Sequence, residues 1–293
     1  MEEEFYIPKS EITFSMKMVR FYFHRVGWLV PSYTAKLFWK LFTKPRNREM
    51  TPGHLKFIEK ASTMTYLSDF YKASYSTHTF GKGETKVLLC HGWEGRTTDF
   101  KSVIEELVSM EVQVISIDFP GHGTSPESQA HLPMFIDVIS SFIKVQNDLS
   151  VFVGHSLGAA SIAMAVPENE SYFKDKKLIL MGLHPVPSQF IDQYKSVTRI
   201  GDRMFERCLR LAEDQLGKSL KGYDCHDHLE LYQKNDVLLV HDSHDKIIRI
   251  NRLEKLNNSI ENSVLFKGKH GGHFKHYKHP DVIAEISAFI HNN

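Results

Sequence analysis

The 293-residue sequence has few cysteines, no long apolar run and no excess of charge of one sign. Its cysteines, Cys90, Cys208 and Cys225, are too few and too widely spaced for a disulfide framework. The absence of an 18-residue apolar run argues against a membrane-spanning helix. The start, Met1-Glu2-Glu3-Glu4, is acidic where a signal peptide needs positive charge. A reduced, cytoplasmic protein is therefore expected.

The charge balance narrows the choice of partners. With 36 Lys and Arg against 35 Asp and Glu, the net charge is +1, so no global basic field attracts nucleic acid. A hydrophobic content of 42% and an aromatic content of 12% exclude disordered and fibrous classes. The length allows one large domain or two ordinary ones.

The first 55 residues form a region of distinct composition. Between Glu11 and Glu49 every charged side chain is basic, and apolar residues at helical spacing fill the gaps. We therefore predict an arm, residues 1–55, of two short amphipathic helices broken near Pro31. Such an arm can attach peripherally to an anionic membrane or to a partner, or it can pack on its own domain with a solvated basic face. Amphipathic helices mostly cover a core, which favours packing.

From about residue 60 onward, short apolar runs alternate with longer helical stretches. The predicted strands are 86–90, 112–117, 150–153, 178–181, 237–240 and 264–266, with two weaker ones at 65–70 and 75–80 that could open the sheet as an antiparallel hairpin. The predicted helices are 99–110, 134–145, 157–166, 249–257 and 282–290. Continuously apolar strands alternating with helices indicate an α/β fold, a mostly parallel central sheet with helices on both faces.

One interval interrupts this alternation. The 55 residues between Met181 and Val237 are far more than one crossover needs. They contain a helical stretch, residues 203–216, and the cluster Cys225-His226-Asp227-His228. We interpret residues 184–234 as a helical lid inserted over the carboxyl edge of the sheet, where open α/β sheets bind ligands.

The segment Gly154-His155-Ser156-Leu157-Gly158 follows a predicted strand and precedes a predicted helix. A serine on such a sharp turn has an exposed hydroxyl, and small residues two positions away let strand and helix pass closely. The amide of Leu157 then lies at a helix N-terminus, where it can stabilise an oxyanion. Ser156 is thus a predicted nucleophile; the alternative is a glycine-rich turn with a capping serine.

A serine nucleophile needs a base and an orienting acid later in the chain. After strand 237–240, Asp242 and Asp245 are both candidates, and Asp245 is favoured because it lies further into the loop. After the last strand, His270, His273 and His276 compete for the role of base. His273 is favoured, since it follows two glycines that let the loop approach the site; His270 is the second choice.

Residues 60–293 resemble the α/β-hydrolase superfamily, in its serine-nucleophile esterase and lipase-like branch. The resemblance rests on the His91-Gly92-Trp93-Glu94-Gly95 loop, the 118–125 segment DFPGHGTS, the 154–158 segment, His244-Asp245 and Gly272-His273-Phe274. It implies a triad of Ser156, Asp245 and His273. It also implies oxyanion-hole amides at Leu157 and at Trp93 or Glu94. The basic arm lies outside the resemblance.

The expected function is a serine hydrolase that cleaves a small or medium carboxylic ester through an acyl-enzyme. A thioesterase or acyltransferase with the same triad and a non-catalytic ligand-binding protein of this fold remain alternatives. Members that open epoxides use aspartate as nucleophile, which Ser156 argues against. Trp93 and His155 are expected at the substrate, with His155 also packing under the turn. No cofactor or metal is implied, because the histidines at 270, 273, 276 and 279 lack the spacing of a metal-binding helix. The oligomeric state is not indicated.

Overall fold

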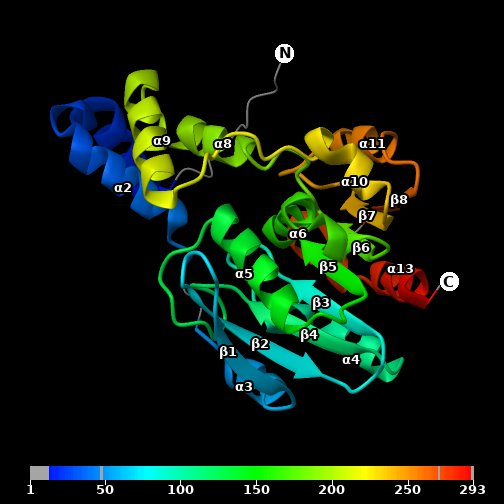
Figure 1. The fold of residues 1–293 in the computed structure, drawn as a ribbon. Helices are drawn as coiled ribbons and strands as arrows, with labels where there is room; N and C mark the ends of the chain where they lie inside the picture. The colour runs from blue at the N-terminus through cyan, green and yellow to red at the C-terminus, as the bar shows by residue number, and fades with distance from the viewer. Residues whose placement is uncertain (1–12, 47–48, 270, 292–293) are drawn as a thin grey trace. The chain divides into compact units, whose positions relative to one another are not determined.

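The computed structural model describes residues 13–46, 49–269 and 271–291, and the chain divides into two units. The first unit consists of the N-terminal residues as far as Lys44 together with Val186–Tyr223. The second consists of Pro45–Pro185 and the chain from Asp224 onward (Figure 1). The division differs from the expected one of an arm over 1–55 and a lid over 184–234. The arm is shorter, and it shares a unit with the insertion.

The second unit is built on an eight-stranded sheet in the order β1-β2-β4-β3-β5-β6-β7-β8. The strands are Ser62–Leu67 (β1), Ser74–Phe80 (β2), Lys86–Cys90 (β3), Gln113–Asp118 (β4), Val151–His155 (β5), Lys177–Met181 (β6), Asp236–Asp242 (β7) and Ser263–Gly268 (β8). β1 pairs antiparallel with β2 and β2 antiparallel with β4, whereas all other pairs are parallel. The α/β-hydrolase fold class and the antiparallel opening hairpin are confirmed.

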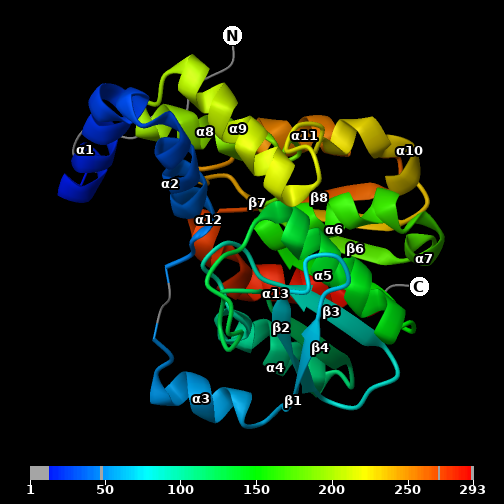
Figure 2. The same cartoon turned by 60° about the vertical axis from the view of Figure 1, so that its left-hand side comes forward.

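Helices cover both faces of this sheet (Figures 1 and 2). The helices of this unit are Pro52–Ile58 (α3), Lys101–Ser109 (α4), Leu132–Val145 (α5), Leu157–Glu168 (α6), Glu170–Phe173 (α7), Leu229–Tyr232 (α10), Ile250–Asn257 (α11), Gly272–Lys275 (α12) and Pro280–His291 (α13). α4 and α13 pack together on one face, and α5 packs against α6 on the other. Alternate strand residues such as Val87, Val153 and Ile179 form one buried core with the first pair. The central strands are thus apolar on both faces, as their sequences predicted.

The first unit joins the N-terminal helices to the insertion. Its helices are Phe14–Phe21 (α1), Pro31–Thr43 (α2), Gln189–Thr198 (α8) and Asp202–Leu216 (α9). A π turn and a 3₁₀ turn separate α1 from α2, and Pro31 opens α2. α2 packs on α9, and α1 contacts α8. The two predicted N-terminal helices with a break near Pro31 are confirmed. None of the helices in the described ranges is long and apolar enough to cross a membrane.

Candidate active site

Ser156 occupies a strained turn between β5 and α6. Its backbone angles are φ 52° and ψ −115°, a region that residues with a side chain rarely adopt. Two glycines make the turn sterically feasible. A Cβ on Gly154 would lie 2.6 Å from the Ala159 Cα, and one on Gly158 would lie 2.3 Å from the Cys90 carbonyl oxygen. The small residues are therefore required by the close passage of strand and helix, as the motif predicted.

A chain of hydrogen bonds joins Ser156, His273 and Asp245. The Ser156 Oγ lies 2.9 Å from the His273 Nε2, and the His273 Nδ1 lies 2.7 Å from the Asp245 Oδ2. A carboxylate can only accept, so Nδ1 carries the proton, and Nε2 of the neutral ring accepts from the Ser156 hydroxyl. Asp245 and His273 are both buried. The structure thus brings together the three residues that the sequence singled out.

The loop after β7 positions the carboxylate. The backbone amides of Ile247 and Ile248 donate to the Asp245 Oδ1 at 2.7 and 2.9 Å. Burial raises the pKa of Asp245, but the hydrogen bonds from His273 and from these amides together lower it by more. The pKa therefore lies below its usual value. Asp242, the competing acid, instead accepts from the His244 amide at 2.8 Å.

Two glycines carry the histidine loop to the serine. Gly271 and Gly272 have φ values of 104° and 56°, in the left-handed region, directly before His273. His276 is buried, and its Nδ1 donates to the Gly272 carbonyl at 2.9 Å, so it does not occupy the position of the base. His270, the second choice, lies outside the described residues.

The amides expected to form the oxyanion hole flank the serine. Leu157 begins α6, so its N–H is one of the donors that a helix N-terminus leaves unpaired. The loop containing Trp93 is close, since a Cβ on Gly92 would lie 3.0 Å from both the Ser156 Cβ and the His155 carbonyl oxygen. His91 holds this loop by donating from Nδ1 to the Gly92 carbonyl and accepting from the Phe119 amide at Nε2.

An ion pair that the sequence did not reveal fixes the residue after Trp93. Glu94 has a φ of 56°, and its carboxylate accepts from both the backbone amide and the guanidinium of Arg46, with a shortest distance of 2.7 Å. Two residues further on, the Arg96 guanidinium donates to the Glu49 carbonyl at 3.3 Å. The segment that follows the arm is therefore bonded to the oxyanion loop. The exposed Arg46 could pair with any of several carboxylates, so no local pattern could have identified this pairing.

His155 packs under the nucleophile turn, which is one of the two roles expected of it. It is buried, and its Nε2 lies 2.8 Å from the carbonyl oxygen of His273, so the ring donates to the backbone of the histidine loop. Burial and the neighbouring His273 and His276 hold the pKa of His155 well below its usual value, which keeps the ring neutral. The ring therefore ties the nucleophile turn to the base. Trp93 is half-buried, and its ring meets that of His122 with centroids 5.3 Å apart.

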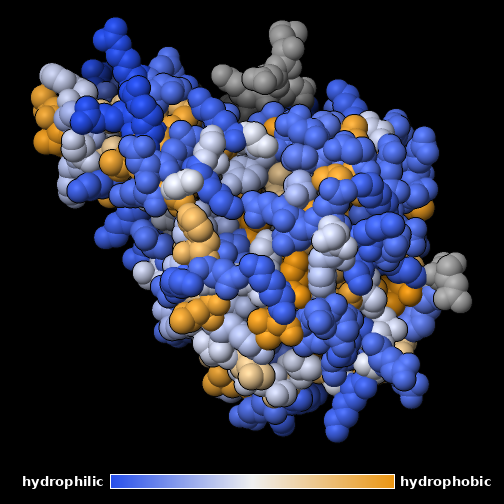
Figure 3. Space-filling model, in the orientation of Figure 1, coloured by the Kyte–Doolittle hydropathy of each residue, from blue (hydrophilic) through white to orange (hydrophobic). Residues whose placement is uncertain are grey.

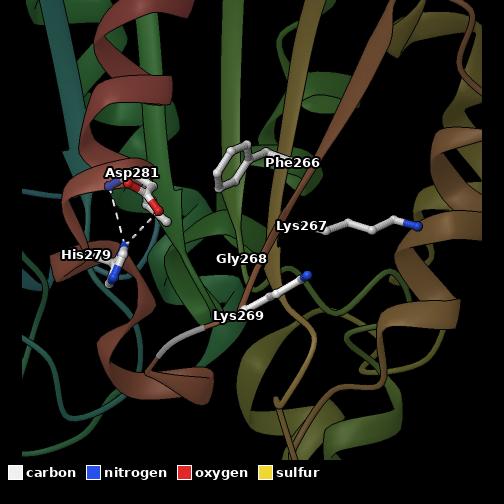
Figure 4. Close-up of a pocket in the computed structure, with 7 residues that line it drawn as sticks. Phe266, Lys267, Gly268, Lys269, His279 and Asp281 are labelled. Carbon is white, nitrogen blue, oxygen red and sulfur yellow. Dashed lines mark hydrogen bonds and ion pairs between the residues drawn. The ribbon is translucent and has the colours of Figure 1, made fainter.

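A small cavity of about 140 Å³ lies apart from these residues, along β8 and the start of α13 (Figure 4). His279 and Asp281 form an ion pair at one side of the cavity, and the side chains of Lys267 and Lys269 point away from this pair. Ser156, His273 and Asp245 do not line this cavity, and its charged groups do not converge. Within the part of the chain that the structure describes, no group of three His, Cys, Asp or Glu side chains is arranged to hold a metal ion.

Comparison with known proteins identifies the family. Residues 87–286 match the model of the alpha/beta hydrolase family, which covers more than half of the chain. The chain therefore belongs to the alpha/beta hydrolase family. A serine hydrolase-like protein of Dictyostelium discoideum is 28% identical over 117 residues, which is 38% of this chain and 32% of that protein. The match thus spans about a third of the length of this relative.

Solved esterases share the fold at low sequence identity. The esterase EaEST from Exiguobacterium antarcticum is 18% identical with a TM-score of 0.58, and the similarity covers 78% of this chain and 99% of the esterase. A thermophilic esterase from Thermogutta terrifontis is 17% identical with a TM-score of 0.60, over 79% of this chain and all of that one. The similarity to these structures shows the shared fold.

Proposed function

We propose that the protein is a serine hydrolase that cleaves small or medium carboxylic esters through an acyl-enzyme. The observation that carries this proposal is the hydrogen-bonded chain from the Ser156 hydroxyl through His273 to Asp245. A serine hydroxyl is a weak nucleophile until a base accepts its proton, and this chain supplies the base and its orienting carboxylate.

Acylation follows from this geometry. His273 Nε2 takes the proton as the Ser156 oxygen attacks the ester carbonyl carbon, and the amides of Trp93 and Leu157 donate to the resulting oxyanion. Each donor contributes about 3–4 kcal/mol to lowering the barrier. Asp245 stabilises the charged imidazole. When the tetrahedral intermediate collapses, the carbon–oxygen bond to the alcohol breaks, and His273 returns the proton to the leaving alcohol.

Deacylation repeats these steps with water. His273 removes a proton from water as the water oxygen attacks the acyl-enzyme, and it then protonates the departing Ser156 oxygen. The products are the carboxylic acid and the alcohol, and no cofactor enters either half-reaction.

A fluorophosphonate probe tests the nucleophile. We expect the probe to label the wild-type protein and the Ser156→Ala variant to remain unlabelled. Ser171→Ala is a matched control, because Ser171 lies exposed on α7 and takes no part in the hydrogen bonds that join Ser156, His273 and Asp245. An unlabelled wild type, or a labelled Ser156→Ala variant, would overturn the assignment.

Paired substrates test the ester class. Turnover of p-nitrophenyl esters of graded acyl length, each compared with the CoA thioester of the same acyl group, measures the preferred leaving group and chain length. We expect the short and medium oxygen esters to have the higher kcat/KM. A preference for the thioesters would replace the esterase assignment with that of a thioesterase on the same triad.

A further inference from the structure

The N-terminal helices bury one apolar face within their own unit. Phe23, Phe38 and Trp39 are almost fully buried. The Phe38 ring meets the rings of Tyr194 on α8 and Phe205 on α9, with centroids 5.1 and 5.9 Å apart. These residues account for the packing of the arm on the insertion. Several other apolar residues of the arm are exposed.

A second apolar set remains exposed on α1. Phe14, Met18 and Phe21 recur at the spacing that places residues on one helix face, and they are 78%, 53% and 59% exposed. No residue of α1 is buried. The described part of the chain therefore leaves this face of α1 uncovered.

The connection between α1 and α2 and the first turn of α2 extend this set. Trp28, Leu29, Val30 and Tyr33 are all exposed, three of them by more than 60%. The Trp28 indole N–H donates to the Arg25 carbonyl at 2.9 Å, so its polar atom is satisfied while the ring is accessible. Single exposed apolar residues are common, but a concentration of this kind marks an interaction surface. Trp and Tyr are the residues enriched at membrane–water interfaces.

The same unit carries an excess of positive charge. Exposed basic side chains accompany the apolar set at Lys17, Arg25, Lys36, Lys40 and Lys44. Residues 13–44 and 186–223 contain 13 basic and 5 acidic side chains, a charge of +8 in a chain whose total is +1. The four glutamates and one lysine among residues 1–12 lower this to +5 for the whole unit. Apolar and hydrophilic side chains alternate on the visible face of the N-terminal helices (Figure 3).

We propose that this surface of the first unit, defined by Phe14, Met18, Phe21, Trp28, Leu29, Val30, Tyr33, Lys17, Lys36 and Lys40, binds an anionic phospholipid membrane. Apolar side chains enter the boundary between headgroups and acyl chains, while the lysines lie at the level of the phosphates. A second copy of the chain would bring two surfaces of like charge together, which disfavours self-association through this surface. The charge thus selects the lipid surface as occupant. The inference does not depend on the proposed catalytic activity.

Sedimentation with vesicles tests the proposal on the full chain. Vesicles of phosphatidylcholine alone are compared with vesicles containing one part phosphatidylglycerol to three parts phosphatidylcholine, at low and high salt. We expect the protein to pellet with the anionic vesicles at low salt, and screening to release much of it at high salt. Equal binding to neutral vesicles, or none to anionic ones, would overturn the proposal.

Two sets of variants separate the apolar and the basic contributions. Replacing Phe14, Met18 and Phe21 together by Ser should weaken anionic-vesicle binding at least about tenfold. Replacing Lys17, Lys36 and Lys40 together by Gln should weaken it about a hundredfold, at about fivefold per lysine. The matched controls are Leu67→Ser/Val145→Ser/Val264→Ser and Lys56→Gln/Lys82→Gln/Lys174→Gln, all exposed positions of the second unit.

The readouts keep folding and self-association apart from lipid binding. Unchanged melting temperatures show that each variant folds, since every replaced side chain is exposed. Control variants that lose as much binding as the test variants would contradict a localised surface. Sedimentation velocity without lipid identifies a dimer; a dimer abolished by the apolar variant, with no vesicle binding by the wild type, would assign the surface to a second copy instead.

Discussion

The backbone strain at Ser156 predicts that glycine and alanine at this position differ in their effect on the free energy of unfolding. Its angles, φ 52° and ψ −115°, lie close to those of the first central residue of a type II′ turn, the position that favours glycine. Ser156→Gly and Ser156→Ala both remove the hydroxyl that bonds to His273. They differ only in whether a Cβ remains at the strained position.

The magnitude follows from two opposing terms. A residue with a Cβ in such a region is destabilised by about 1–3 kcal/mol. Glycine avoids this strain but loses about 0.5–1 kcal/mol more backbone entropy on folding. We therefore expect Ser156→Gly to be more stable than Ser156→Ala by about 1 kcal/mol, which is about 2–4 °C in Tm for a domain of this size.

Thermal unfolding followed by circular dichroism measures the difference. Ser140, in the middle of α5, gives a matched control, because there the Gly variant should melt below the Ala variant by a similar amount. An Ala variant at 156 as stable as the Gly variant would refute the strain argument, as would the same order of stability at both sites. Neither variant at 156 should turn over esters, so the replacement that relieves the backbone strain also abolishes activity.

Two further predictions concern acid and pH. Asp245→Asn should lower kcat by about four orders of magnitude, because an amide favours the wrong imidazole tautomer; steady-state kinetics should show a smaller loss for Asp242→Asn, and the reverse order would assign the acid to Asp242. Burial lowers the pKa of His131 to about 3, so below pH 6.5 the unfolded chain binds a proton that the native state excludes. The free energy of unfolding should therefore decrease as the pH is lowered, and at pH 5.5 this group alone should reduce it by about 1.4 kcal/mol relative to pH 7.5. His131→Asn keeps an acceptor at the start of α5 and should narrow the difference in Tm between pH 7.5 and 5.5 by about 2–4 °C; an unchanged difference would contradict the buried neutral ring.

The central strands and the nucleophile turn were predictable because their signals are local. A strand buried on both faces must be apolar along its buried length, and this holds for residues 87–90 of β3, 151–153 of β5 and 178–181 of β6. The tight turn at Ser156 requires small neighbours at fixed offsets, which five residues display. The order of the three hydrogen-bonded residues was predictable, since each lies in the segment that follows a strand and parallel strands end at one edge of the sheet.

The division into units was not predictable, because it depends on surfaces far apart in the chain. α2 and α9 each have an apolar stripe, but neither sequence indicates that the two stripes pack against each other. The hydrogen bond from His155 to the His273 carbonyl was not predictable for a similar reason. A histidine beside a nucleophile has several uses, and only the placement of the backbone 118 residues away selects one.

The bonds between Arg46 and Glu94 set a practical limit on how far the enzyme can be shortened. Removing the N-terminal helices to obtain the sheet-containing unit alone would be harmless to that loop only if the new start retained Arg46. A later start would remove the Arg46 guanidinium from the Glu94 carboxylate, next to Trp93, whose amide we propose as a donor to the oxyanion. The shortest chain that keeps this ion pair therefore begins no later than Arg46.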